Sequence, residues 1–140
     1  MTTLEQTRKS RRKETAEDFT PPALVAEMLD KLPPEVWTDP TKTFCDPAAG
    51  DGNFLVAILA RKLAQGHDPL QALSTIYGVE LMADNVQECK ERLLGILPPL
   101  SDDELREARK ILDHNIVCHD ALLWNFEKWK STKRQVKSLF

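Results

Sequence analysis

Apolar residues recur every three or four positions in several stretches of the chain, and this spacing predicts amphipathic helices. The first helix is expected to start with Thr20 as its N-cap and Pro21 in its first turn, and to end before Pro33. A second helix is expected from Asn53, closed by Gly66. Both begin and end at residues that are typical of helix boundaries.

Two more helices are expected in the second half of the chain. One covers residues 82 to 94 and ends at Gly95. The other begins at Ser101, where Glu104 stands three residues later and completes a capping box. Its apolar residues lie at helical spacing up to Leu112.

Short β-prone runs separate these helices. Residues 43–45, 75–79 and 115–118 are predicted as strands, since each is apolar and bounded by turn-forming residues. Strands that alternate with helices of ten or more residues imply right-handed crossovers and a parallel sheet. The predicted fold class is therefore α/β, with a Rossmann-like parallel sheet of about three strands and flanking helices.

Composition places the chain among ordinary globular domains. It has 140 residues, of which 41% are hydrophobic and 29% charged. Residues 1–18 show no hydrophobic period and are expected to form a flexible arm, while 19–140 form one domain. No apolar run approaches a membrane span and no secretory signal is visible, so a soluble, cytoplasmic protein without a membrane partner is expected. The spacing of Cys45, Cys89 and Cys118 fits neither a disulfide framework nor a zinc site.

The formal charge of −3 is unevenly spread. Residues 1–18 carry +1, residues 19–126 carry −8 and residues 127–140 carry +4. Five cations lie between Arg8 and Lys13, a density that suits contact with phosphate groups. A solvated tail is an equally good interpretation.

Three acids stand directly after the three predicted strands. They are Asp46, Glu80 and Asp120. Because ligands of open parallel sheets bind beyond the carboxyl ends of the strands, these acids are candidate ligand contacts. Glu80 has the position at which a carboxylate accepts from a ribose diol, and Asp120 could accept from an exocyclic amine. Taken singly, each acid could instead be a turn or capping residue.

The loop from Asp46 to Leu55 is the most informative segment. Gly50 and Gly52 allow a tight turn and a close approach of backbone to ligand, and the following helix N-terminus presents free N–H groups. Leu55 stands where the dinucleotide fingerprint requires a third glycine, and no Lys-Ser/Thr pair is present. The loop therefore indicates a ligand site without pyrophosphate or triphosphate chemistry.

Two other groups of residues suggest chemistry less strongly. The adjacent residues Cys118, His119 and Asp120 alternate in direction on a strand, which disfavours convergence on a metal ion, so no metal is expected. Trp124 and Trp129, with Phe126 between them, could stack on bases. The favoured interpretation is a helix that packs its apolar face.

At these residues the chain resembles the class I S-adenosylmethionine-dependent methyltransferases, in particular the amino-methylating DNA adenine methyltransferases. Their Asp-Pro-x-x-Gly-x-Gly-x-Phe/Leu loop corresponds to Asp46–Leu55, and their acids after the second and third strands correspond to Glu80 and Asp120. Their Phe/Tyr-Thr-Pro segment corresponds to residues 19–21. The four motifs occur in the family's order, and the resemblance covers about residues 14–124.

The resemblance implies a fold of the class I methyltransferase type and S-adenosyl-L-methionine as cofactor. In it, the glycine loop holds the methionine part, Glu80 the ribose and Asp120 the adenine amine, while residues 19–21 lie over the cofactor. The implied cofactor-binding residues are Phe19, Thr20, Pro21, Asp46, Pro47, Ala48, Gly50, Gly52, Asn53, Phe54, Glu80, Leu81, Asp120, Ala121 and Leu122.

The chain departs from the family in one respect. The Asp/Asn/Ser-Pro-Pro-aromatic motif that holds the target amine is absent, since Pro33-Pro34 and Pro98-Pro99 each follow a Leu and precede no aromatic residue. No catalytic residue is therefore assigned. The sequence is expected to represent the N-terminal, cofactor-binding half of a DNA adenine N6-methyltransferase, inactive alone, with DNA as a partner once further chain or a complementing polypeptide completes it.

Two alternatives remain open at this stage. One is a non-catalytic module that binds a cofactor or a partner and regulates a methyltransferase or a restriction system. The other is a fragment of an RNA or protein-glutamine methyltransferase, because those enzymes share the motif order.

Overall fold

The computed structural model describes residues 19–132, and its centre is a three-stranded parallel sheet. The strands are β1 (Phe44–Asp46), β2 (Ile76–Glu80) and β3 (Ile116–Cys118), in the order β1-β2-β3. Phe44 pairs with Ile76, and Glu80 pairs with Cys118. The predicted α/β class, the parallel sheet and its three strands are confirmed. The expected arm over residues 1–18 lies outside the described residues.

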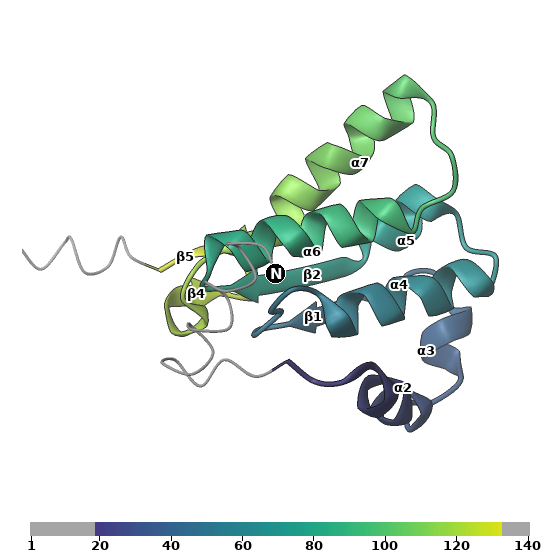
Figure 1. The fold of residues 1–140 in the computed structure, drawn as a ribbon, viewed down its shortest axis with the longest axis horizontal. Helices are drawn as coiled ribbons and strands as arrows, with labels where there is room; N and C mark the ends of the chain where they lie inside the picture. Colours follow the sequence, from purple (N-terminus) through teal and green to yellow (C-terminus); the bar gives the residue numbers. More distant parts are fainter. Residues whose placement is uncertain (1–18, 133–140) are drawn as a thin grey trace, which may run out of the picture.

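Helices precede and connect these strands (Figure 1). They are α2 (Pro22–Asp30), α3 (Glu35–Thr38), α4 (Asn53–Ala64), α5 (Pro69–Ser74), α6 (Ala83–Gly95) and α7 (Asp102–Asn115). The sequence predicts α2, α4, α6 and α7 but misses the two shortest helices. The short helix η1 (Ala121–Leu123) follows β3.

Helix boundaries test the capping predictions. The capping box is confirmed, because Ser101 Oγ accepts from the Glu104 backbone N–H at 3.2 Å and Glu104 Oε1 accepts from the Ser101 N–H at 3.0 Å. The N-cap assignment of Thr20 is wrong, since Pro21 is the N-cap of α2 and no side chain caps that helix. Thr20 contributes its backbone carbonyl to a contact with Asn53 instead.

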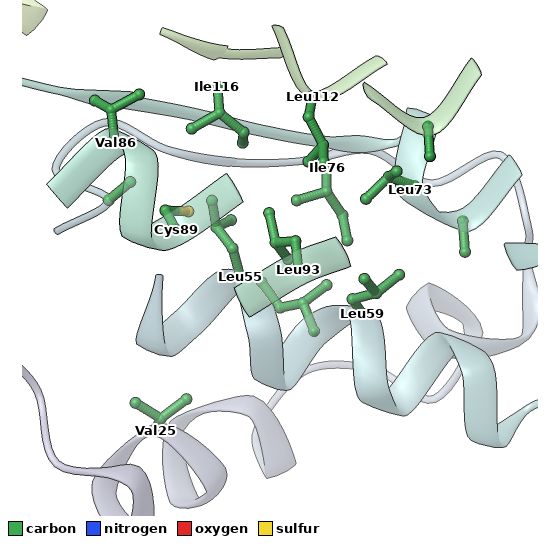
Figure 2. Close-up of a cluster of buried hydrophobic side chains, with 14 of the residues drawn as sticks. Val25, Leu55, Leu59, Leu73, Ile76, Val86, Cys89, Leu93, Leu112 and Ile116 are labelled. Carbon is green, nitrogen blue, oxygen red and sulfur yellow. The ribbon is translucent and has the colours of Figure 1, made fainter. Parts of the chain in front are cut away.

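The hydrophobic core lies where α4 and α6 pack against each other and against the sheet (Figure 2). Leu55 and Leu59 of α4 and Leu93 of α6 have no solvent-exposed surface. They lie in one cluster with Ile76 of β2 and Ile116 of β3. Truncating any of these Leu side chains to Ala would cost about 2–5 kcal/mol, so this cluster holds α4 and α6 against the sheet that carries the candidate site.

An aromatic hairpin follows η1. Its strands β4 (Trp124–Asn125) and β5 (Lys130–Ser131) pair antiparallel, so the predicted helix over this segment is wrong. Trp129 stands edge-to-face with Tyr77 of β2 at 4.9 Å and with Trp124 at 5.2 Å between ring centroids. The Trp129 indole N–H also donates to the His114 carbonyl at 2.7 Å. These contacts hold Trp129 at a φ of 54°, a left-handed conformation that is rare for bulky residues.

No helix within residues 19–132 combines the length and the apolar character needed to cross a membrane. Over the same residues, no three His, Cys, Asp or Glu side chains are grouped so as to hold a metal ion.

Candidate functional site

The carboxyl ends of the three strands bring the predicted acids to one edge of the sheet. Asp46 and Glu80 are the last residues of β1 and β2, and Asp120 follows β3 by two residues. The parallel register places Asp46 opposite Gly78 and Glu80 opposite Cys118. The three acids therefore lie at the carboxyl ends of neighbouring strands, as the sequence predicts, with Asp46 and Glu80 at the last strand position instead of after it.

The Asp46 side chain is hydrogen-bonded within its own loop. One carboxylate oxygen accepts from the Ala48 backbone N–H at 3.0 Å. Burial raises the pKa of the Asp46 carboxyl, the Ala48 N–H lowers it, and the nearby negative charge of Glu80 raises it further. The two carboxylates thus lie close enough to repel each other, and a cation placed between them would relieve that repulsion.

Glu80 links the glycine loop to the start of α6. Its Oε1 accepts from the Gly50 backbone N–H at 3.0 Å. Its Oε2 accepts from the Met82 N–H at 2.8 Å and from the amide of the buried Asn85 at 3.3 Å. An ionised carboxylate offers about four acceptor sites, so about one remains for a ligand.

The two predicted glycines adopt left-handed conformations that favour glycine. Gly50 has a φ of 57°, and a Cβ there would lie 2.8 Å from the Phe19 ring. Gly52 is the N-cap of α4 with a φ of 99°, and a Cβ there would lie 2.9 Å from Cys89 Sγ of α6. Gly50 therefore lets Phe19 cover the loop, whereas Gly52 lets α4 and α6 approach.

A pocket of about 270 Å³ opens between the segment at Phe19 and the glycine loop. Seven of the predicted cofactor-binding residues line it: Phe19, Thr20, Asp46, Ala48, Gly50, Asn53 and Phe54. Ala49 and Asp51 also line it, and the sequence did not single them out. The volume lies just below the range of about 300–1,000 Å³ that is typical of ligand pockets, which suits one part of a larger ligand.

The other predicted residues lie outside that pocket's lining. They are Pro21, Pro47, Gly52, Glu80, Leu81, Asp120, Ala121 and Leu122. Of these, Glu80 and Gly52 contact the loop or its helix, as described above. Asp120 accepts from the Leu122 backbone N–H at 2.9 Å and begins η1. Leu81 and Leu122 face solvent, at 61% and 92% exposure.

Arg92 is a supporting residue that sequence reasoning missed. From α6 its guanidinium donates to the Asp51 carbonyl at 3.0 Å and to Asn53 Oδ1 at 2.9 Å, and it pairs with the Asp51 carboxylate at 3.2 Å. The Asn53 side-chain amide in turn donates to the Thr20 carbonyl at 2.9 Å. Arg92 and Asn53 therefore connect α6, the glycine loop and the covering segment. Arg92 lies 39 residues from Asn53 in the chain, and no local pattern distinguishes it.

The pocket beside Asp46 can hold a small polar ligand with a positive charge against the glycine loop. A second part of the same ligand could reach the Glu80 carboxylate. No protein-family model, no curated protein and no solved structure matches this chain.

Proposed function

We propose that the chain binds S-adenosyl-L-methionine at the loop after β1, as the cofactor-binding part of a DNA adenine N6-methyltransferase. The observation that carries the proposal is the pocket between Phe19 and the glycine loop, with Asp46 in its wall. Two of the four motifs that resemble the family line this pocket, residues 19–21 through Phe19 and Thr20 and the glycine loop itself, and a third contacts the loop through the bond from the Gly50 N–H to Glu80.

The charge of the pocket supports a cationic ligand. Asp46 and Asp51 line it, and no Lys or Arg of the described residues does so; Arg92 pairs with the Asp51 carboxylate at 3.2 Å, so the attraction of a cation rests chiefly on Asp46. A pyrophosphate or triphosphate group would be repelled there, whereas a sulfonium or an ammonium group would be attracted. S-adenosyl-L-methionine carries both of these cations.

The remaining acceptor capacity at the end of β2 supports the ribose contact. With three of about four acceptor sites on Glu80 in use, one ribose hydroxyl can donate to this carboxylate without displacing a loop contact. Asp120 would receive the adenine amine at the end of β3. In this proposal Phe19 closes the methionine end and Leu81 and Leu122 lie beside the adenine.

The reaction would be a direct displacement. Bound S-adenosyl-L-methionine would supply the methyl group of its sulfonium, the adenine N6 nitrogen would take that methyl and give up a proton, and S-adenosylhomocysteine would remain. Positioning the acceptor amine in line with the sulfonium is worth on the order of 7–11 kcal/mol of the barrier. Because the 140 residues contain no Pro-Pro-aromatic motif, we propose that further chain or a complementing polypeptide supplies this positioning.

Titration calorimetry with S-adenosyl-L-methionine, S-adenosylhomocysteine and ATP tests the proposal. The methionine derivative should bind, and the Asp46→Asn variant should bind it about 10-fold more weakly, because the Asn oxygen still accepts from Ala48 but carries no charge. Asp68→Asn is the matched control, since Asp68 caps α5 by a similar backbone contact away from the pocket.

Failure of the folded protein to bind the cofactor, or equally tight binding of ATP, would contradict the assignment. The alternative of a non-catalytic partner-binding module would then be favoured.

We also expect no methyl transfer to adenine-containing DNA by the 140-residue chain alone at saturating cofactor. Incorporation of labelled methyl groups into DNA measures this. Incorporation that Asp46→Asn abolishes would show that the acceptor is positioned by residues of this chain.

A further inference from the structure

The pocket beside the glycine loop has two walls that come from distant parts of the chain. The covering segment, residues 19–21, forms one wall through Phe19 and Thr20, and the loop with the first turn of α4 forms the other. The Phe19 ring lies against Gly50, since a Cβ there would be 2.8 Å from that ring. A ligand in the pocket would therefore contact both walls, and the separation of the walls determines whether it can enter or leave.

A hydrogen bond joins the two walls. The Asn53 side-chain amide donates to the Thr20 carbonyl at 2.9 Å, across 33 residues of sequence. Asn53 is the first residue of α4 and also lines the pocket. This bond therefore closes the covering segment onto the loop at the pocket itself.

Helix α2 holds the other end of the covering segment. The Val25 N–H donates to the Pro21 carbonyl at 3.0 Å, and the Val25 side chain is buried in the core. Arg61 of α4 donates to the Ala26 carbonyl at 3.1 Å and pairs with the Asp30 carboxylate at 2.7 Å. These contacts fix α2 on α4 without help from the bond at the pocket. The start of the covering segment can thus move away from the loop while α2 stays in place.

Arg92 determines which end of the Asn53 amide faces the covering segment. A guanidinium only donates, so it must face the amide oxygen, and it donates to Asn53 Oδ1 at 2.9 Å. The amide nitrogen is thereby turned to the Thr20 carbonyl, which only accepts. Arg92 is held in turn by the Asp51 carbonyl at 3.0 Å and the Asp51 carboxylate at 3.2 Å. A half turn of the Asn53 amide would oppose donor to donor and acceptor to acceptor, so one orientation is favoured.

We propose that the contacts from Arg92 to Asn53 and from Asn53 to Thr20 form a latch, which keeps the covering segment closed over the pocket and sets how fast a ligand is exchanged. Arg92 is a positioning residue, because it does not line the pocket and acts through Asn53. The latch is a property of the free protein. That the retained ligand is S-adenosyl-L-methionine rests on the proposed function.

Fluorine NMR of the 140-residue protein with 4-fluorophenylalanine in place of Phe19 measures the latch without any ligand. Relaxation dispersion of this resonance gives the population of the open form. The main variant is Asn53→Asp, which keeps the oxygen that accepts from Arg92 but turns a second oxygen, instead of an N–H donor, to the Thr20 carbonyl. Because a carboxylate is favourable in the first turn of a helix, this variant should fold.

The ratio of open to closed forms should rise at least about five-fold in Asn53→Asp, since an attractive contact becomes a repulsive one. Arg92→Met should raise the ratio about two- to five-fold, because the Asn53 amide is no longer held in one orientation. Arg61→Met is the matched control. Arg61 also binds a backbone carbonyl and an Asp carboxylate, but both lie on α2, so the ratio should stay unchanged.

Stopped-flow release of S-adenosyl-L-methionine gives a second readout. Release should be at least about five-fold faster from Asn53→Asp than from the parent protein, because the open form is more populated. The added negative charge attracts the cationic cofactor and by itself would slow its release. Faster release from this variant therefore reports the latch and not the change of charge.

An open population that is unchanged in Asn53→Asp, or that rises equally in Arg61→Met, would overturn the proposal. A larger open population with unchanged or slower release of bound cofactor would also overturn it. A parent protein that binds no cofactor would contradict the proposed function instead, and the fluorine measurement would still decide whether the latch closes the covering segment.

Discussion

The loops that follow β1 and β3 differ in how they are held. The loop after β1 is bound from three directions, by Glu80 at the Gly50 N–H, by Arg92 at Asp51, and through Asn53 to the covering segment. In the loop after β3, the Asp120 carboxylate is bound, within the described residues, only by a neighbouring residue of the same loop. Asp120 accepts from the N–H of Leu122, two residues further on, and the Leu122 side chain is 92% exposed.

This difference implies a division of roles in binding. A site whose residues are fixed before the ligand arrives loses little conformational entropy on binding. We therefore expect the methionine part to meet a preformed pocket after β1. The adenine part should meet an acid that, among the described residues, is held only within its own loop, although His119 and Leu123 tie that loop to Glu80 and to the hairpin. Variants in the first loop should change both stability and affinity, whereas variants in the second should change affinity alone.

The largest effect is expected from Gly50→Ala. Its left-handed φ and a Cβ at 2.8 Å from the Phe19 ring should together lower the free energy of unfolding by at least about 2 kcal/mol and displace Phe19 from the pocket. Urea unfolding and cofactor titration measure the two effects. Gly66→Ala is the control, since Gly66 also has a positive φ but has no atom within 4 Å of a Cβ. It should cost about 1 kcal/mol and leave affinity unchanged; equal losses of affinity in both variants would remove Gly50 from the site.

Arg92→Met comes next. It keeps most of the apolar stem but removes the contacts to Asp51 and Asn53, and should cost about 1.5–3 kcal/mol of unfolding free energy. Arg109→Met is the comparison, because Arg109 and Glu91 are both more than half exposed and lie 3.8 Å apart. It should cost about 0.5 kcal/mol or less. Similar losses in the two variants would mean that Arg92 does not brace the loop.

The pH dependence of cofactor binding should follow the protonation of the Asp46 carboxyl. Its pKa is raised in the folded protein, chiefly by burial, so the folded state favours the protonated carboxyl relative to the unfolded state. The contribution of this group to stability is therefore unfavourable above the raised pKa, and this penalty is relieved as the pH falls through it. Affinity for a cationic cofactor should fall over the same acidic range, because the charge that attracts it is lost.

Calorimetric titrations between neutral and acidic pH measure this effect. The Asp46→Asn variant should bind the cofactor more weakly, and its affinity should change less with pH. A profile with the slope of the parent protein would assign the titrating group elsewhere.

The smallest structural effect is expected in the loop after β3. Asp120→Asn keeps an oxygen that can accept from Leu122, so the free energy of unfolding should change by less than about 0.5 kcal/mol. If Asp120 receives the adenine amine, cofactor affinity should fall about 3- to 10-fold, since a charged acceptor is replaced by a neutral one. A large loss of stability with unchanged affinity would reverse the contrast between the two loops.

Sequence reasoning was most accurate where structure is determined locally. The glycine loop, α4 and the capping box of α7 follow from neighbouring residues, so their positions could be predicted. Helices α3 and α5 were missed because four and six residues are too few to show a helical period. The aromatic hairpin was missed because the spacing of its aromatic residues also fits a helix, and the contact of Trp129 with Tyr77 on another strand cannot be read from the local sequence.

The contacts that support the site could not be predicted either, because they join residues far apart in the sequence. Arg92 reaches the glycine loop across about forty residues of sequence. Lys62 of α4 is fully buried, and its ammonium donates to the Lys42 carbonyl and to Thr75 Oγ1, each at 2.6 Å. Nothing in the sequence separates these two side chains from solvated cations, because only the tertiary fold brings their acceptors together.

The most direct test of the central claim is the change in backbone amide NMR shifts when S-adenosyl-L-methionine is added. The account predicts that the amides of Ala48, Gly50 and Asn53 move, together with that of Met82 beside Glu80, while those of Gly66 and Gly95 stay in place. Shifts confined to other parts of the fold, or no shifts at saturating cofactor, would contradict a cofactor site at the loop after β1.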